Sequence, residues 1–241
     1  LNKELKYNME QDTISISKQI YWRVYYWLFV ERFNKKIDFN FKKNIFRWDL
    51  INFLHNNNNF QSYLEIGCDE DLLFSKISIQ NKIGVDPLFG GNTRKTSDQF
   101  FDTNQLNFDC VFIDGLHIYK QVKKDILNSL KCLNDGGYIL VHDCLPHSLS
   151  SQAVPRYKIT WNGDVWKAIV DLRQQDDIEI FTCLVDYGIS IIQKKKNSDP
   201  LKIDKNIGQL KFKDFYNNHT KYMRTITFDE FKLKFQNKQS S

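Results

Sequence analysis

The stretch CVFIDGLHIYKQVKKDILNSLKCLNDGGYILVHD, Cys110–Asp143, decides the fold class. It begins and ends with short apolar runs of strand length. Between them, apolar residues recur at helical spacing from Ile118 to Leu133, which predicts a helix with one apolar face. The glycines of NDGG can take the positive φ at which a helix ends. A strand, a helix and a strand in this order predict a parallel sheet that is covered on both faces.

The rest of the chain fits around this unit. YLEIG (63–67) and KIGVD (82–86) are further predicted strands, and IEIFTCLV and ISIIQ are predicted to form a hairpin through Asp186-Tyr187-Gly188. Helical patterns occupy 17–33, RWDLINFLH and VWKAIVDLR, with Asp164 as the N-cap of the last, and a short helix starts at Thr227. We therefore divide the chain into a helical extension (1–59), a main domain (60–196) and a C-terminal extension (197–241).

Composition limits the classes of partner. The formal net charge is +5, but no basic stripe is present, so a nucleic-acid partner is not expected. The five cysteines form no C-x-x-C pair, which favours reduced thiols in a cytoplasmic protein, and no cleavable signal peptide opens the sequence. The aromatic run YWRVYYWLFV (21–30) is too short to cross a bilayer. It could pack on the core, form a homodimer contact or rest on a membrane surface.

Polar residues follow the predicted parallel strands, at the sheet edge where α/β proteins bind ligands. The first strand carries Glu65 and Gly67, and the second ends in Asp86. The later strand ends carry Asp114 with Gly115 and His117, and His142 with Asp143. Such acids often cap the next helix instead. However, an acid after the second strand can hold a ribose, two carboxylates can hold Mg²⁺, and a histidine can take a proton from a hydroxyl.

These residues carry a family resemblance. The blocks FIDGLH and GGYILVHD, followed by NGDVWKAIVDLR, resemble the class I S-adenosylmethionine (SAM)-dependent methyltransferases. More narrowly, they are similar to the macrocin-type O-methyltransferases, which act on macrolide sugars. The resemblance covers about Tyr63 to Gln193. It implies an α/β, Rossmann-like sheet of seven strands, mostly parallel with an antiparallel terminal hairpin, and helices on both faces.

The resemblance also implies roles for individual residues. SAM would be bound by residues of the loops after the strands: Glu65, Gly67, Cys68, Asp86, Ser97, Asp98, Asp114 and Gly115. Ser97 and Asp98 would lie where a third strand ends and would face the adenine. Mg²⁺ would be held by Asp114, His142 and Asp143, with His117 and Asp143 as catalytic residues.

Two positions depart from the family pattern. The later glycine of the first motif is Asp71, and His142 stands where metal-binding relatives often have an acid. Histidine is a poorer partner for Mg²⁺ than an oxygen ligand. A metal-free mechanism with His117 or Asp143 as base therefore stays open beside the metal-dependent one.

The expected activity is methyl transfer to a hydroxyl of a sugar or another small molecule. The loop CLPHSLSSQAVPRYKITWNGD would cover the acceptor, with Arg156, Tyr157 and Trp161 as contacts. The alternatives are a non-catalytic methyltransferase-like binding domain or a metal-independent methyltransferase that acts on another acceptor. An NAD-dependent oxidoreductase is disfavoured because Asp69, Glu70 and Asp71 would repel a pyrophosphate, whereas SAM carries positive charge.

Overall fold

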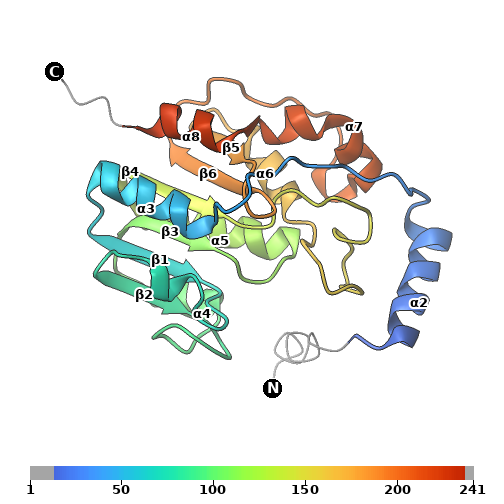
Figure 1. The fold of residues 1–241 in the computed structure, drawn as a ribbon, viewed down its shortest axis with the longest axis horizontal. Coiled ribbons are helices and arrows are strands. Elements are labelled where there is room, and N and C mark those ends of the chain that lie inside the picture. The colour runs from blue at the N-terminus through green and yellow to red at the C-terminus, as the bar shows by residue number, and fades with distance from the viewer. Residues whose placement is uncertain (1–13, 237–241) are drawn as a thin grey trace.

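The computed structural model describes residues 14–236, and its centre is one seven-stranded sheet with the order β2-β1-β3-β4-β6-β5-β7 (Figure 1). Strands β1 to β4 are parallel, β6 is antiparallel to β4 and β5, and β7 is parallel to β5. The strands are β1 (Ser62–Ile66), β2 (Asn81–Val85), β3 (Phe108–Ile113), β4 (Leu133–Val141), β5 (Ile178–Cys183), β6 (Ile189–Lys194) and β7 (Thr225–Ile226). The predicted mostly parallel sheet with an antiparallel terminal hairpin is confirmed.

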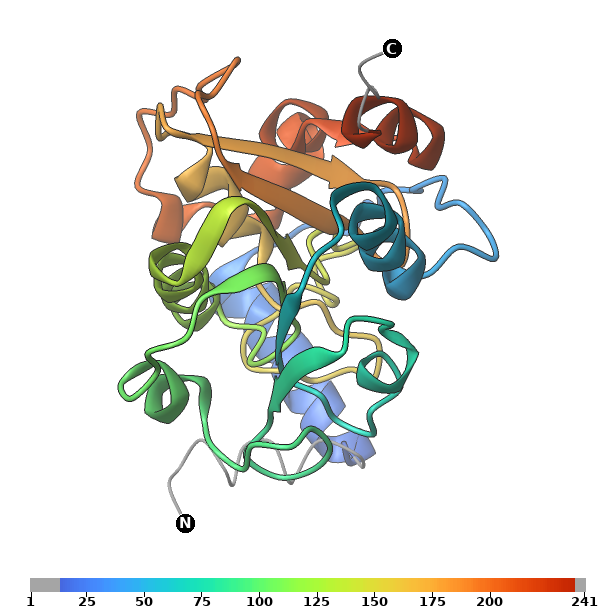
Figure 2. The ribbon, with the colours of Figure 1, turned by 90° about the vertical axis from the view of Figure 1, so that its left-hand side faces the viewer.

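Helices cover both faces of the sheet, as Figure 2 shows edge-on. On one face lie α3 (Arg47–Asn58) and α8 (Phe228–Phe235), and on the other α4 (Ser97–Phe101), α5 (Tyr119–Lys131), α6 (Trp166–Leu172) and α7 (Phe212–Met223). Single 3₁₀ turns form η2 (Phe74–Lys76) and η3 (Ile207–Gln209). Two hydrophobic clusters correspond to these two faces.

Side-chain alternation along the strands builds the two clusters. In β3, Val111 and Ile113 join the cluster under α5 and α6, while Cys110 and Phe112 join the one under α3 and α8. Both sets are buried, as expected for a parallel strand covered on both sides. The interior positions of the strands are therefore fixed by packing, which leaves their carboxyl ends free to carry polar groups.

The third strand that the resemblance implied is absent from the described residues. Residues 87–95 form a loop that makes one isolated bridge, Val85 to Thr93, and turns back so that the backbone N–H groups of Asn92 and Thr93 donate to the carbonyl of Gly84. Pro87 and the Gly90-Gly91 pair favour turns over an edge strand. The prediction of a third strand before TSDQFF is thus wrong. The seventh strand is instead the short β7 at the opposite edge.

Two local predictions also need correction. The NDGG segment lies inside β4, after α5 has ended at Lys131. The Asp164 carboxylate accepts the backbone N–H of Tyr119, so it caps the start of α5, not that of α6. Helix α7 is not among the predicted elements, because its aromatic residues are spread among polar ones in the sequence. The helix predicted at Thr227 is confirmed, with a capping box between Thr227 and Glu230.

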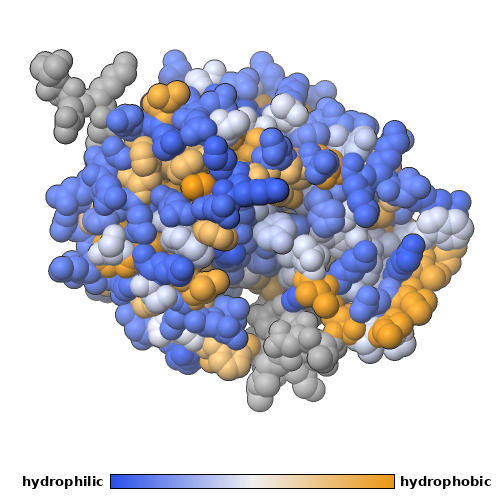
Figure 3. Space-filling model, viewed as in Figure 1, coloured by the Kyte–Doolittle hydropathy of each residue, from blue (hydrophilic) through white to orange (hydrophobic). Residues whose placement is uncertain are grey.

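The aromatic N-terminal segment forms α2 (Ile16–Tyr25), which continues into a π-helical turn, η1 (Tyr26–Val30). It stands at the side of the molecule, and Figure 3 shows orange surface there. No residue of α2 is buried, and in η1 only Tyr26 is. Packing of this helix on the core is therefore limited to one side. No helix within residues 14–236 is long and apolar enough to cross a membrane.

Candidate active site

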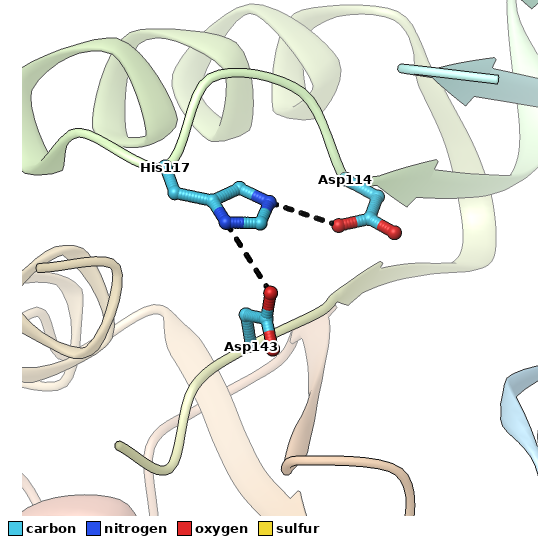
Figure 4. Close-up of side chains that lie close together, drawn as sticks. All are labelled: Asp114, His117 and Asp143. Carbon is cyan, nitrogen blue, oxygen red and sulfur yellow. Dashed lines mark hydrogen bonds and ion pairs between the residues drawn. The ribbon is translucent and has the colours of Figure 1, made fainter. Parts of the chain in front are cut away.

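Three of the predicted site residues meet where β3 and β4 end. His117 lies between two carboxylates (Figure 4). Its Nε2 is 3.1 Å from Asp114 Oδ1, and its Nδ1 is 3.2 Å from Asp143 Oδ2. A ring that faces a carboxylate with each nitrogen is best satisfied as an imidazolium, because both nitrogens then donate. The parallel pairing of β3 with β4 places the two aspartates side by side.

A second histidine and two residues that the sequence reasoning missed complete the group. His142 Nδ1 is 3.0 Å from Asp114 Oδ1, and its Nε2 faces Asp186 Oδ1 at 3.6 Å. Arg47 forms an ion pair with Asp114 Oδ2 and donates from Nε to Asp186 Oδ2 at 2.7 Å. Arg47 begins α3 and Asp186 lies in the β5–β6 turn, so only tertiary contacts bring them here.

The electrostatics of the group favour the charged forms of Asp114 and of the two histidines, whereas burial raises the pKa of Asp143. Burial disfavours charge on Asp114, yet His142, His117 and Arg47 hold the pKa of this carboxyl well below its usual range. Burial also opposes protonation of the histidines, but the carboxylates outweigh it: the pKa of His142 is raised to about 10 and that of His117 is raised as well. These pKa shifts arise because opposite charges lie within a few ångströms of one another in a site that is partly shielded from water.

The segment after β4 closes over His117. The ring of Trp161 stacks on the imidazole, and Asn162 Nδ2 donates to Asp143 Oδ1 at 2.8 Å. Gly163 comes so close that a Cβ there would lie 1.8 Å from the His117 carbonyl oxygen. Of the three predicted acceptor contacts, Trp161 lies at the site and Arg156 sits near its ring, whereas Tyr157 is buried against Tyr26.

The predicted cofactor turn after β1 is held by contacts within the protein. Gly67 has a positive φ, and a Cβ there would lie 2.4 Å from the carbonyl oxygen of Asp114. The close approach that the structure shows at Gly67 is to the backbone at the end of β3. Next to it, Glu65 is buried and accepts a 2.6 Å hydrogen bond from Tyr63 Oη. Burial raises the pKa of Glu65 to about 8.

The acid predicted to hold the ribose is already bonded to backbone. Asp86 Oδ2 accepts the N–H groups of Cys68 and Asp69, both at 3.1 Å. Its Oδ1 accepts those of Leu88 and Phe89 at 2.8 and 2.9 Å. A carboxylate offers about four acceptor positions, so these contacts use them. Asp86 thus shapes the turn in this state, and a ribose role requires that some of these bonds give way.

Asp71 explains the departure from the glycine motif. Its φ is +61°, in the left-handed region where the family has glycine, and aspartate tolerates that region better than most residues. Its Oδ1 accepts the N–H of Gly91 at 2.5 Å, which ties the loop after β2 to the turn after β1. Asp71 is therefore a structural link between the two loops.

Ser97 and Asp98 begin α4 and do not end a strand. Gln121 of α5 donates to Ser97 Oγ and Asp98 Oδ1, and Lys124 pairs with Asp98. These two residues therefore join α4 to α5, away from the group around His117. The predicted adenine contact at Ser97 and Asp98 stays a prediction, without the strand that suggested it. Gly115 follows Asp114 at the edge and leaves room beside Ile66.

One family model matches the segment that contains Asp114, His117 and Asp143. Residues 76–144 match the sequence model of a family described as "Methyltransferase domain". The segment runs from before β2 to just after Asp143. The strand order 2-1-3-4-6-5, with the antiparallel pair at its end, is the Rossmann-like methyltransferase sheet without its outer edge strand.

Particular relatives are distant. The chain is 31% identical over 124 residues to "Uncharacterized protein R132" of Acanthamoeba polyphaga mimivirus, which covers 39% of this chain and 56% of that protein. The chain thus matches just over half the length of this curated relative.

Solved structures are similar only in fold. An O-methyltransferase from Bacillus cereus in complex with SAH gives 11% identity and a TM-score of 0.45, covering 65% of this chain and 85% of that one. MycE methyltransferase from the mycinamycin biosynthetic pathway, in complex with Mg, SAH and mycinamycin VI, is 14% identical with a TM-score of 0.42. The match covers 64% of this chain and 50% of that one. Likenesses at this level carry no argument about chemistry.

The side chains around His117 come close enough together to raise the question of a metal ion. One ligand atom each of Asp114, His117 and Asp143 lies within 4.8 Å of the others, which is close enough to surround an ion. However, both oxygens of Asp114 already face protein cations, Asp143 Oδ2 faces His117, and the third candidate ligand is an imidazole nitrogen. Mg²⁺ prefers oxygen ligands in octahedral geometry. As arranged, these residues do not fit Mg²⁺, so no chemistry is derived through it.

Proposed function

We propose that this chain transfers a methyl group from SAM to a hydroxyl of a sugar or another small molecule. The observation that carries the proposal is His117 between Asp114 and Asp143, at the carboxyl edge of a methyltransferase-domain sheet. In this transfer the bond from sulfur to methyl breaks, the bond from oxygen to methyl forms, and the hydroxyl proton must leave. As the acceptor of that proton we propose the Asp143 carboxylate, whose Oδ2 lies 3.2 Å from the His117 imidazolium that orients it.

The charge of the turn after β1 supports SAM as the donor. Asp69 and Glu70 are exposed there, and Asp71 is half-buried. The SAM sulfonium is positive and the molecule has no phosphate, so these acids attract it, whereas they would repel a pyrophosphate. The Asp86 carboxylate keeps the turn in shape through the N–H groups of Cys68 and Asp69. Proposed cofactor contacts are therefore the turn itself and the neighbouring Gly115.

Trp161 supports a saccharide or a similar ring as the acceptor. Its indole covers His117, and Arg156 lies 5.7 Å from the ring centroid. Sugar rings bind against aromatic faces beside hydrogen-bonding groups. The acceptor would enter along this loop and present its hydroxyl to the pair of His117 and Asp143.

Two measurements test the proposed function. Calorimetric titration with SAM should give measurable heat, and radiolabelled SAM should deliver its methyl group to a compound in a small-molecule extract. His117→Ala should abolish transfer and keep SAM affinity, while His219→Ala on α7, outside the site, should keep both. A chain that binds no SAM would instead be a non-catalytic member of this fold, which the occupied Asp86 carboxylate would then explain.

For the exposed side of α2 and η1, we propose a homodimer contact. The exposed apolar residues there are Ile16, Ile20, Tyr21, Val24, Tyr25, Trp27, Leu28 and Phe29. Together they offer on the order of 800 Å², about what one partner contributes to a standard interface. Light scattering should give twice the chain mass, and Ile20→Glu should give the monomer. A monomeric wild type that sediments with anionic vesicles would show a membrane surface in place of the second copy.

We also propose a reducing, cytoplasmic environment. All five cysteines are free and buried, and burial raises the pKa of Cys144 to about 12. Buried neutral thiols pack as small apolar side chains and gain nothing from an oxidising compartment. Cells should be lysed in denaturant that contains a thiol-alkylating reagent, and the alkylated cysteines of the chain counted. We expect all five cysteines to be alkylated, and therefore reduced.

A further inference from the structure

The buried group at the strand ends includes a cation that belongs to the protein itself. Arg47 extends from the start of α3 and contacts Asp114 with Nη1 and Asp186 with Nε. We propose that the Arg47 guanidinium takes the place of a divalent metal ion at this acidic site, so that the site works without a metal and binds one only when Arg47 is removed.

Charge balance is the first argument. Three carboxylates, those of Asp114, Asp143 and Asp186, lie in the group, and each side chain is at most 17% exposed. Carboxylates that lie this close together and are shielded from water need compensating cations. Arg47 and the two histidines provide them: each carboxylate has at least one within 3.2 Å. The group is balanced by its own side chains, which removes the electrostatic demand for an ion.

The shape of the guanidinium is the second argument. Two of its nitrogens reach two different carboxylates at once, which its planar fork allows and a lysine ammonium does not match. The Oδ2 atom of Asp114 that Arg47 contacts is the one that the histidines leave available. Arg47 therefore occupies the remaining ligand position of the very carboxylate that a metal would need.

The anchoring of Arg47 is the third argument. It is the first residue of α3, whose start is fixed by a 2.8 Å hydrogen bond from the Phe46 N–H to Asp49 Oδ2. Leu50, Ile51 and Leu54 are fully buried and hold the helix against the sheet. With its own side chain only 21% exposed, Arg47 is held by a rigid element. An ion could not displace it without moving the side chain from two carboxylates.

The experiment measures Mn²⁺ binding to the whole chain without SAM, by electron paramagnetic resonance and by thermal shift against NaCl of matched ionic strength. We expect no site-specific binding to the wild type. Arg47→Met leaves Asp114 and Asp186 without their guanidinium, so it should melt earlier in chelator. It should also bind Mn²⁺ at least about tenfold more tightly than the wild type, a difference of about 1.4 kcal/mol. Adding Asp114→Asn to Arg47→Met should abolish the gain.

Two further variants keep the test decisive. Arg94→Met removes an arginine 4.0 Å from Asp86, outside the site, and should gain no Mn²⁺ binding. If Arg47→Met does not fold, Arg47→Lys, which keeps one charge, should show a smaller gain. Tight Mn²⁺ binding by the wild type, or folded Arg47 variants that bind no better than it, would overturn the proposal. Since neither result involves SAM, failure here is distinct from failure of the proposed methyl transfer.

Discussion

The indole of Trp161 stacks on the imidazole of His117, with ring centroids 5.2 Å apart and planes inclined by 27°. The indole is itself fixed, because its Nε1 donates to the carbonyl of Ala153. Ala153 belongs to a small cluster with Tyr26 and Tyr157, so η1 supports the loop that holds Trp161. The orientation of His117 therefore depends on the loop after β4 and, through that loop, on η1.

Replacing Trp161 should misplace His117 without changing the proposed SAM-binding turn after β1. Trp161→Ala removes the stacked ring, and a displacement of about 1 Å in a reacting group can cost about 100-fold in rate. We expect kcat to fall by that order while SAM affinity, measured by calorimetry, stays within twofold. Trp161→Phe keeps an aromatic face and should retain most of the rate. Unchanged kcat in Trp161→Ala would contradict the positioning role.

Gly67→Ala should damage the fold before it affects cofactor binding. The added Cβ would meet the Asp114 backbone at 2.4 Å, in a left-handed conformation. Strain of this kind costs about 1–3 kcal/mol, and the clash adds to it. The matched control is Gly136→Ala, which also has positive φ but has open space around it. Denaturant unfolding should show a clearly larger loss for Gly67→Ala. Equal losses would mean that the contact with Asp114 is unimportant.

Asp71 should stabilise the paired loops through its side chain. Asp71→Ala loses the hydrogen bond from Gly91 and places alanine in a left-handed conformation. The expected cost is about 1–2 kcal/mol of unfolding free energy. Asp71→Asn keeps an acceptor oxygen and tolerates the same backbone, so it should lose less than half as much. The urea midpoints of the two variants, compared with the wild type, check this, and equal midpoints for both variants would refute it.

Glu65 should make stability depend on pH. Burial raises its pKa in the folded protein from 4.5 to about 8. Between these values the folded state holds a proton that the unfolded state has lost, so this residue's contribution is fully present below about pH 4.5 and declines up to about pH 8. The decline amounts to at most about 5 kcal/mol.

The variant Glu65→Gln isolates this effect. Glutamine keeps an oxygen for the Tyr63 hydroxyl but does not ionise. Relative to the wild type, it should have similar stability near about pH 4 and gain stability as the pH rises toward about 9. Urea unfolding across this range gives the difference. A difference that does not vary with pH would show that Glu65 is not protonated in the folded protein.

Much of the fold was predictable because it depends on local patterns. The apolar stripe from Ile118 predicted α5, and the turn at Asp186-Tyr187-Gly188 predicted the β5–β6 hairpin. Where local signals were weak, the predictions failed. The loop containing Gly90 and Gly91 has turn-forming residues, and only its hydrogen bonds to Gly84 show that no third strand forms there.

The candidate site was predictable in part for the same reason. Strand-end positions identified Asp114, His117 and Asp143, because parallel strands bring their carboxyl ends to one edge. Nothing in the neighbourhood of Arg47 or Asp186 marked them as partners, since they lie 139 residues apart in sequence. The ribose-binding role of Asp86 was predicted only from its position after the second strand. That position in the sequence does not reveal the four backbone N–H groups that donate to its carboxylate.

The sequence by itself therefore determined the class of sheet and the acids and histidines that edge it, since strand period and helix period are local properties of the chain. The tertiary structure alone decided which charges neutralise them. Coulombic attraction depends on distance in space, and the packing of α3 against the sheet brings the Arg47 guanidinium to Asp114. The residues of the glycine-poor turn after β1 are likewise explained by contacts in space. Gly67 is needed because the backbone at the end of β3 lies against it, and Asp71 binds a loop 20 residues later in the sequence.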